Sequence, residues 1–321
     1  MNRPLVVATR SNFPGCGLAL LEDVADVRVC GSAGPPTREE LVEAAAGCFG
    51  MICTVAERID ASLLEAIGPS LRVIANVAAG YDNIDIAECA RRNIGVANTP
   101  DVLTDVTADL TFALLLATAR RVPEAIAAVR AGEWPPWNSV WMCGTGLAGK
   151  TLGIVGLGKI GRAVARRARP FGLEIVHTNS RDGLRLDDLL QQADIVTLHC
   201  PLNAATHHLI GDREFEIMKP TAILINTARG GVVDQEALVR ALQTGKIWAA
   251  GIDVTDPEPL PPTSPLLALP NCVVLPHIGS ATIETRTKMV DMAVSNVIAA
   301  IRGDPMPHSV VHRRDRRGTV T

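Results

Sequence analysis

The feature that most constrains the fold is the alternation of short apolar runs with helix-like segments along nearly the whole chain. Each run is too short for a helix and rich in aliphatic residues, so we predict buried strands. In the first third, the predicted strands are residues 5–8, 27–29, 50–54, 73–75 and 95–97, separated by helical segments such as 38–46 and 61–66. Strands that alternate with helices are typical of doubly wound α/β folds built on parallel sheets.

A second α/β series opens at Lys150, after a helix-rich stretch and a loop with three tryptophans. Its predicted strands are residues 151–155, 174–178, 194–199, 222–226, 249–253 and 272–275. The last helical segment, 284–302, follows the completed series, so we expect it to return to the first domain. We therefore expect two doubly wound domains with a cleft between them. They are residues 1–99 plus about 283–321, and residues 100–282. The basic tail from Arg313 is expected to be loose.

Composition excludes several classes of protein. Hydrophobic residues make up 47% of the 321 residues and charged residues 20%, which supports a large core and argues against disorder. A net charge of −3 does not favour nucleic acid or an anionic membrane as a partner. The longest apolar run, 110–119, is too short to cross a bilayer. The eight cysteines contain no CxxC pair, so we expect reduced, mostly buried thiols in a cytoplasmic protein.

A glycine-rich loop, Gly156-Leu157-Gly158-Lys159-Ile160-Gly161, lies between a predicted strand and a helical segment at 162–171. In this context the glycines allow a tight turn, close approach to a pyrophosphate and helix–strand packing. The helix N-terminus offers N–H groups to the phosphates. The simpler alternative is a turn that happens to contain three glycines. The flanking elements favour a Rossmann-type dinucleotide site that includes Lys159 and Ile160.

The cofactor preference depends on the residues after the next predicted strand. NAD sites usually place an acid about 20 residues after the glycines, to bind the ribose 2′-OH. No acid occurs from Ile175 to Arg181. Ser180 and Arg181 can instead bind a 2′-phosphate, so we expect NADP, with NAD as the alternative and Asp182 as the rival ribose ligand.

At this point the sequence resembles the D-isomer-specific 2-hydroxyacid dehydrogenases over nearly its whole length. Several motifs in the right order carry the resemblance: the glycine loop, Leu198-His199-Cys200-Pro201-Leu202, Ile225-Asn226-Thr227-Ala228-Arg229-Gly230-Gly231, Asp253-Val254-Thr255-Asp256-Pro257-Glu258-Pro259 and Leu275-Pro276-His277-Ile278-Gly279-Ser280-Ala281-Thr282. Two further runs are most similar to the glyoxylate/hydroxypyruvate reductase branch: Pro100-Asp101-Val102-Leu103-Thr104-Asp105 and Trp141-Met142-Cys143-Gly144. Relatives usually place a further helix and strand after the position of Arg181, for which residues 182–193 have too little room.

The resemblance implies reduction of a small 2-oxo acid, with Arg229, Glu258 and His277 as the catalytic set. The chemistry of these residue types agrees. Arginine binds a carboxylate or carbonyl, and histidine can donate a proton near neutral pH. A glutamate beside the histidine favours the imidazolium. Taken singly, each has an ordinary structural reading as a surface cation, a turn residue or a core histidine.

The resemblance also assigns binding residues. In the first domain, small residues after a predicted strand can form an anion-binding nest, which the family uses for the substrate carboxylate, so Ala79 and Gly80 are assigned there. The remaining cofactor-contact or substrate-side positions are Thr107, Pro201, Thr227, Asp253, Gly279 and Ser280. Arg286 is a weaker candidate, for orienting the site.

Residues 102–149 correspond to the dimer contact of the family, and we expect a symmetric homodimer. The helix at 110–119 is apolar nearly all round, so one small domain would struggle to cover it. We further expect Trp141 to reach the partner subunit's active site and restrict it to small substrates. The alternative is that Trp141 only packs within its own subunit or the interface.

Two other functions stay open. One is a dinucleotide-sensing interaction protein of the same fold, and the other is a dehydrogenase for another 2-oxo acid, such as a keto-gluconate or phosphoglycerate. His207-His208 invites a metal site, but adjacent residues rarely point at one ion and no carboxylate cluster accompanies them, so we expect no metal.

Overall fold

The computed structural model describes residues 3–31 and 34–311, so the basic tail from Arg313 lies outside the described residues. The chain divides into two compact units. The first is Met1–Leu103 together with Ala281–Thr321, and the second is Thr104–Ser280. Each unit contains a six-stranded sheet with helices on both faces. The predicted fold class, two doubly wound α/β domains, is confirmed in each unit taken by itself.

The sheet of the first unit has the strand order β12-β5-β4-β3-β1-β2. The strands are β1 (Leu5–Ala8), β2 (Asp26–Val29), β3 (Gly50–Cys53), β4 (Val73–Asn76), β5 (Gly95–Ala97) and β12 (Ser309–Val311). The helices are α1 (Gly17–Glu22), α2 (Arg38–Ala45), α3 (Ala61–Ile67), α4 (Ile86–Arg91) and α11 (Ile283–Arg302). All strand pairs are parallel except β12 with β5, which is antiparallel. The sequence analysis did not predict β12.

Alternation of side chains along the strands explains why this sheet is covered on both faces. Val6 and Ile52 pack with α11, while their neighbours Val7 and Met51 pack with α2 and α3. Successive side chains of a strand point to opposite faces, so a strand buried on both sides must be apolar throughout. That is the pattern from which these strands were predicted.

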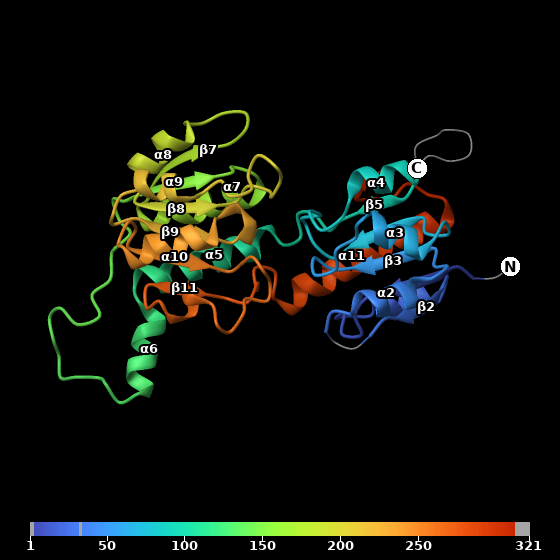
Figure 1. Cartoon of the computed structure of the whole chain (residues 1–321), viewed down its shortest axis with the longest axis horizontal. Coiled ribbons are helices and arrows are strands. Elements are labelled where there is room, and N and C mark those ends of the chain that lie inside the picture. The colour runs from blue at the N-terminus through green and yellow to red at the C-terminus, as the bar shows by residue number, and fades with distance from the viewer. Residues whose placement is uncertain (1–2, 32–33, 312–321) are drawn as a thin grey trace. The chain divides into compact units, whose positions relative to one another are not determined.

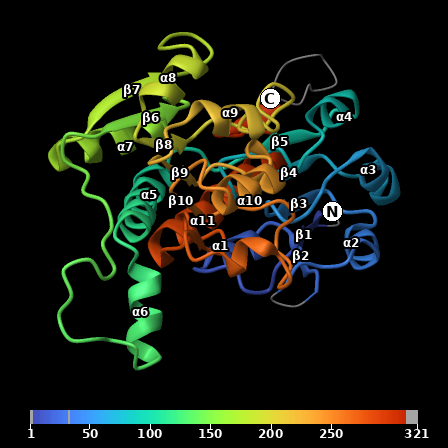
Figure 2. The ribbon, with the colours of Figure 1, turned by 60° about the vertical axis from the view of Figure 1, so that its left-hand side comes forward.

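The sheet of the second unit has the order β11-β10-β9-β8-β6-β7 and is wholly parallel. The strands are β6 (Thr151–Val155), β7 (Glu174–Thr178), β8 (Ile195–Leu198), β9 (Ile223–Asn226), β10 (Ala249–Ile252) and β11 (Cys272–Val274). The helices are α5 (Thr104–Ala119), α6 (Val122–Arg130), α7 (Lys159–Ala168), α8 (Leu186–Gln192), α9 (Asp212–Ile217) and α10 (Gln235–Gln243). Short 3₁₀ turns lie at Arg169–Phe171, Gly230–Val232 and Pro265–Ala268. Figure 2 shows α7 and α5 near one another in this unit, where they are in contact.

The second sheet ends at β7. Among residues 182–193, all of which are described, the structure has one helix, α8, and no strand beyond the isolated bridge of Gly183 to Thr178. This agrees with the shortage of residues in the sequence. The edge at β7 therefore lacks the helix and strand that relatives are expected to add.

Helix α5 is covered by its own unit on most sides, but Leu110 and Ala117 are only partly buried and Ala113 is exposed, so the expectation that one unit would not cover it on every side is met. It packs against β9, β10, β11 and α7, and Phe112, Leu114 and Leu115 are buried. The sheet lies against one side of this apolar helix and α7 against another. Larger exposed apolar side chains lie on α6, which extends from the rest of the unit in Figure 1.

No helix among residues 3–31 and 34–311 has both the length and the apolarity needed to cross a membrane. All eight cysteines are free thiols. Four are buried, Cys200 and Cys272 are partly buried, and Cys16 and Cys143 are exposed. Six of the eight thiols are therefore buried or partly buried, as expected.

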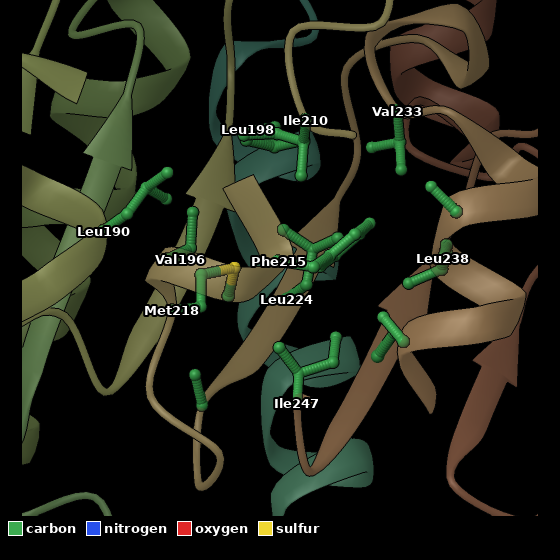
Figure 3. Close-up of a cluster of buried hydrophobic side chains, with 14 of the residues drawn as sticks. Leu190, Val196, Leu198, Ile210, Phe215, Met218, Leu224, Val233, Leu238 and Ile247 are labelled. Atoms are coloured by element: carbon green, nitrogen blue, oxygen red, sulfur yellow. The ribbon is translucent and has the colours of Figure 1, made fainter. Parts of the chain in front are cut away.

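One side of the second sheet packs around Phe215 of α9, which is 1% exposed and lies near Met218 and Leu224 (Figure 3). We predict that Phe215→Ala lowers the free energy of unfolding by about 3–5 kcal/mol, because it leaves a cavity in a close-packed core. Chemical denaturation measures the loss. The matched control is Phe171→Ala, at a ring that is 44% exposed, which should cost about 1 kcal/mol. Equal losses in the two variants would contradict the central position of Phe215.

Candidate functional site

Backbone proximity explains two of the three glycines in the loop between β6 and α7. Gly156 has φ of 97°, and a Cβ there would lie 2.6 Å from the backbone nitrogen of Cys200. A Cβ at Gly161 would overlap the carbonyl oxygen of Gly156. Around Gly158, by contrast, no described atom lies within 4 Å of the Cβ position. The loop thus holds α7 tightly against the sheet while leaving open space before the helix N-terminus at Lys159, where N–H groups can meet an anion.

The turn after β7 uses Asp182 for its own structure. The carboxylate of Asp182 accepts a hydrogen bond from Asn179 Nδ2 at 2.5 Å and lies 3.3 Å from His177 Nε2. These two hydrogen bonds lower the pKa of Asp182. The Asn179 side-chain oxygen in turn accepts the backbone N–H of Arg181 at 2.7 Å. Ser180 and Arg181 lie at this turn, and Arg181 is exposed.

Arg229 follows the carboxyl end of β9, in a loop organised by the buried Asn226. The side-chain amide of Asn226 donates to the Arg229 carbonyl at 2.9 Å, and its oxygen accepts the N–H of Ala228 at 3.0 Å. A Cβ on Gly230 would overlap the carbonyl group of Thr255, so this loop touches the one that follows β10. That contact brings the Arg229 loop against the segment that carries Glu258.

Glu258 and His277 form a hydrogen-bonded pair. His277 Nδ1 lies 2.8 Å from Glu258 Oε2, and the second oxygen, Oε1, accepts the N–H of Thr255 at 2.9 Å. Burial raises the pKa of Glu258, but the hydrogen bond and charge of His277, the Thr255 N–H and the charge of Arg229 outweigh it, and the net shift is downward. The hydrogen bonds among the described residues engage Nδ1 of His277 and not Nε2. A carboxylate can only accept, so Nδ1 carries a proton and Nε2 is left for a ligand.

Asp253, at the end of β10, has a buried oxygen without a partner. Its Oδ1 accepts the N–H of Ile278 at 2.8 Å, whereas no hydrogen-bond donor among residues 3–31 and 34–311 reaches Oδ2. Burial raises the pKa of Asp253, although the nearby N–H groups of Ile278 and Gly279 and the charge of His277 act against the rise. A buried acceptor of this kind requires an explanation, and a ligand with an N–H group beside Gly279 supplies one.

The other predicted positions divide between the two units. In the second unit, Thr107 Oγ1 donates to the Gly279 carbonyl at 3.2 Å, and Thr227 Oγ1 lies 2.9 Å from Thr111 Oγ1. Ser280 is half-buried and Pro201 is exposed on the loop after β8. Ala79, Gly80 and Arg286 belong to the first unit.

The last positions considered in the sequence analysis are Trp141, in the tryptophan loop, and the pair His207-His208. Trp141 is half-buried, while Trp137 is 90% exposed and Trp134 is also exposed. The rings of His207 and His208 stack with centroids 4.0 Å apart. Among the described residues, no group of three or more His, Cys, Asp or Glu is arranged to hold a metal ion.

Sequence reasoning did not single out several polar residues that organise these loops. In the second unit they are Asn226 and Thr111. In the first unit they are Asn76, Asn83 and Asn98, whose side chains hydrogen-bond around the loop after β4. A signal existed for two of them, since Asn76 and Asn226 are polar residues that end otherwise apolar strands. Ligands of open α/β sheets bind outside the carboxyl ends of strands, so such residues are candidates for shaping a site.

Comparisons with known proteins agree with this geometry. Residues 112–279 match the family model "D-isomer specific 2-hydroxyacid dehydrogenase, NAD binding domain". The chain is 45% identical over 320 residues to a glyoxylate reductase of Korarchaeum cryptofilum, an alignment that covers 96% of each chain. A solved structure from Thermus thermophilus has a TM-score of 0.89 and 46% identity, with coverage of 96% of this chain and 100% of that one. The NADPH-dependent glyoxylate/hydroxypyruvate reductase of Sinorhizobium meliloti, solved with NADP and malonate, has a TM-score of 0.82 and 32% identity, with coverage of 98% and 99%.

Proposed function

Because the chain belongs to the D-isomer specific 2-hydroxyacid dehydrogenases and is thus an NAD(P)-dependent oxidoreductase, we propose that it reduces small 2-oxo acids, with glyoxylate and hydroxypyruvate as its substrates. The observation that carries this proposal is the His277–Glu258 pair, which lies on loops at the carboxyl edge of a parallel sheet, with the Arg229 charge close enough to lower the pKa of Glu258. Relatives named as reductases favour an enzyme over an interaction protein of the same fold.

The three side chains divide the work of the reduction. The nicotinamide supplies the hydride to the carbonyl carbon when the cofactor is bound. His277 Nε2 donates the proton to the carbonyl oxygen, so that a 2-hydroxy acid forms. Glu258 keeps the proton on Nδ1 and stabilises the charged imidazole. Arg229 binds the carboxylate and polarises the carbonyl.

The residues fit a dinucleotide. The loop from Gly156 to Gly161 would hold the pyrophosphate at the N-terminus of α7. The unpartnered Oδ2 of Asp253 would accept an N–H from the carboxamide of the nicotinamide. Further contacts come from the positions that line these loops: Thr107, Lys159, Ile160, Pro201, Thr227 and Gly279. Ser280 stays assigned to the substrate side.

For the cofactor preference we propose NADP. Asp182 is occupied within its turn, which weakens it as a ribose ligand, while Ser180 and the exposed Arg181 are available to a 2′-phosphate. A relative that is NADPH-dependent shares the fold over 98% of this chain.

For the assembly we propose a symmetric homodimer through residues 102–149. Val122, Ile126 and Val129 are exposed on α6 at spacings that place them on one helix face. The following loop adds the exposed Trp134 and Trp137. Apolar surface of this kind marks an interaction site, and a partner copy would cover it.

The free thiols fit a reducing, cytoplasmic setting.

The first prediction that follows from the proposed function concerns the proton donor. His277→Ala should lower kcat for glyoxylate by roughly 10²-fold or more, the usual contribution of a positioned acid, and leave the Kd of NADPH nearly unchanged. Glu258→Gln should instead narrow the usable pH range, with reduction lost at a lower pH than in the wild type, because the charged imidazole loses its anionic partner. Wild-type turnover in the alanine variant, or an unaltered pH–rate profile in the glutamine variant, would contradict these roles.

The second prediction concerns the cofactor. Arg181→Ala should raise KM for NADPH by about tenfold, since it removes one charge-assisted contact, and should leave KM for NADH nearly unchanged. Steady-state kinetics with both cofactors measure this. An equal effect on the two would show that Arg181 does not contact the 2′-phosphate.

The third prediction concerns Trp141. If it restricts the partner subunit's site, Trp141→Ala should remain dimeric and shift the kcat/KM ratio from hydroxypyruvate toward the bulkier phenylpyruvate. Ile126→Asp is the companion variant, which should sediment as a monomer because a charge enters the apolar face of α6. A monomeric wild-type protein at micromolar concentration would overturn the dimer, and an unshifted ratio would overturn the role of Trp141.

A further inference from the structure

Three carbonyl groups follow one another in the loop after β4, and each accepts a hydrogen bond. The Ala78 oxygen accepts the backbone N–H of Thr99 at 2.8 Å. The Ala79 oxygen accepts Asn98 Nδ2 at 2.7 Å, and the Gly80 oxygen accepts Asn76 Nδ2 at 2.9 Å. This is the loop whose N–H groups are assigned to the substrate carboxylate, so any role of these hydrogen bonds in binding rests on the proposed function.

Sheet register places the two asparagines side by side. Strands β4 and β5 are parallel, with Ala75 opposite Ala97. Asn76 ends β4, and Asn98 follows β5 directly. Both side chains therefore lie at the carboxyl edge of the first sheet, in contact with the loop after β4.

Fixing a carbonyl also fixes the next N–H group. In a planar trans peptide the C=O of one residue and the N–H of the next point in opposite directions. Asn98 therefore sets the direction of the Gly80 N–H through the Ala79 carbonyl, and the Thr99 backbone does the same for the Ala79 N–H. The hydrogen bonds among the described residues engage the carbonyls of this loop and not the N–H groups of Ala79 and Gly80.

We propose that Asn98 is a positioning residue for the substrate. Asn76 supports it by holding the next carbonyl of the same loop, that of Gly80. By holding the Ala79 carbonyl, Asn98 keeps the peptide between Ala79 and Gly80 from turning its oxygen toward the bound carboxylate. An N–H dipole attracts the anion and a carbonyl dipole repels it, so the orientation of this one peptide decides whether it attracts or repels the carboxylate.

The asparagines are themselves held firmly. Asn76 is fully buried, and its Nδ2 also donates to Asn83 Oδ1 at 3.1 Å. Asn83 Nδ2 donates to the carbonyls of Thr54 at 3.0 Å and Glu57 at 2.9 Å. Glu57 is buried in an ion pair with Arg10 at 2.5 Å.

On the other side, the backbone N–H of Asn98 donates to the His308 carbonyl at 3.3 Å, next to β12. The His308 N–H in turn donates to Asn296 of α11 at 2.9 Å. The C-terminal strand and helix thus hold the asparagine that orients the loop.

The test is Asn98→Ala, because Asn98 is only half-buried and can be truncated with less risk to folding than Asn76. In the full-length protein with NADPH bound, we expect KM for glyoxylate and the Kd of oxamate, an unreactive 2-oxo acid analogue, each to rise about tenfold, as for the loss of one hydrogen bond to an anion site. The kcat should stay within about threefold and KM for NADPH should not change. Asn98→Asp keeps the shape but replaces the donor by a charge, so its Kd for oxamate should rise further.

The control is Asn93→Gly. Asn93 precedes β5, at the opposite edge of the sheet, and its φ of 56° suits glycine. This variant should keep wild-type KM and oxamate binding. Equal oxamate affinity in the Asn98 variants and the wild type would overturn the positioning role and leave the reductase proposal intact. Oxamate binding that depends on Asn98 in a protein without turnover would support the role and remove the proposed function instead. No oxamate binding by the wild type would remove both.

Discussion

The candidate site depends on one backbone contact, the approach of Gly230 to the Thr255 carbonyl, where a Cβ would not fit. Arg229 comes from the loop after β9 and Glu258 from the loop after β10, and this contact presses the two loops together. His277 is then fixed from the next loop along, since its N–H donates to the Asp253 carbonyl at 2.8 Å. Parallel strands deliver all three loops to the same edge of the sheet, and the absence of a side chain at one residue allows them to converge.

Two carboxylates beside this contact are shifted in opposite directions. Both are penalised by burial, but Glu258 has the imidazole, an N–H and a nearby arginine to stabilise its charge, whereas one oxygen of Asp253 has no partner among the described residues. The pKa of Glu258 therefore falls and that of Asp253 rises. Environments that separate two similar groups in this way assign them different roles. Glu258 is suited to stay ionised beside the imidazole of His277, and Oδ2 of Asp253 is suited to accept a hydrogen bond from an N–H group.

Much of the fold could be predicted from the sequence, because strands buried on both faces leave continuous apolar runs. Strand β12 could not, since Ser309–Val311 carries no such run and becomes a strand only by pairing with β5. The environment of α5 could be predicted only in part. The apolar surface of a helix does not show what covers it, and here its own sheet and α7 cover most of it. The Arg229, Glu258 and His277 positions were predicted from motifs, whereas Asn98 was not singled out, because its place beside the loop after β4 arises from a register between strands that no local pattern displays.

The order of segments in the two units has a consequence for synthesis on the ribosome. The second unit is one uninterrupted stretch, Thr104–Ser280, whereas the first is completed by α11 and β12 at the far end of the chain. Domains generally fold as units while the chain emerges. Until residues 104–280 have been made, the first unit therefore lacks α11 to cover one face of its sheet and β12 to pair with β5. The unit that matches the NAD binding domain can thus be in place before the sheet of the first unit is complete.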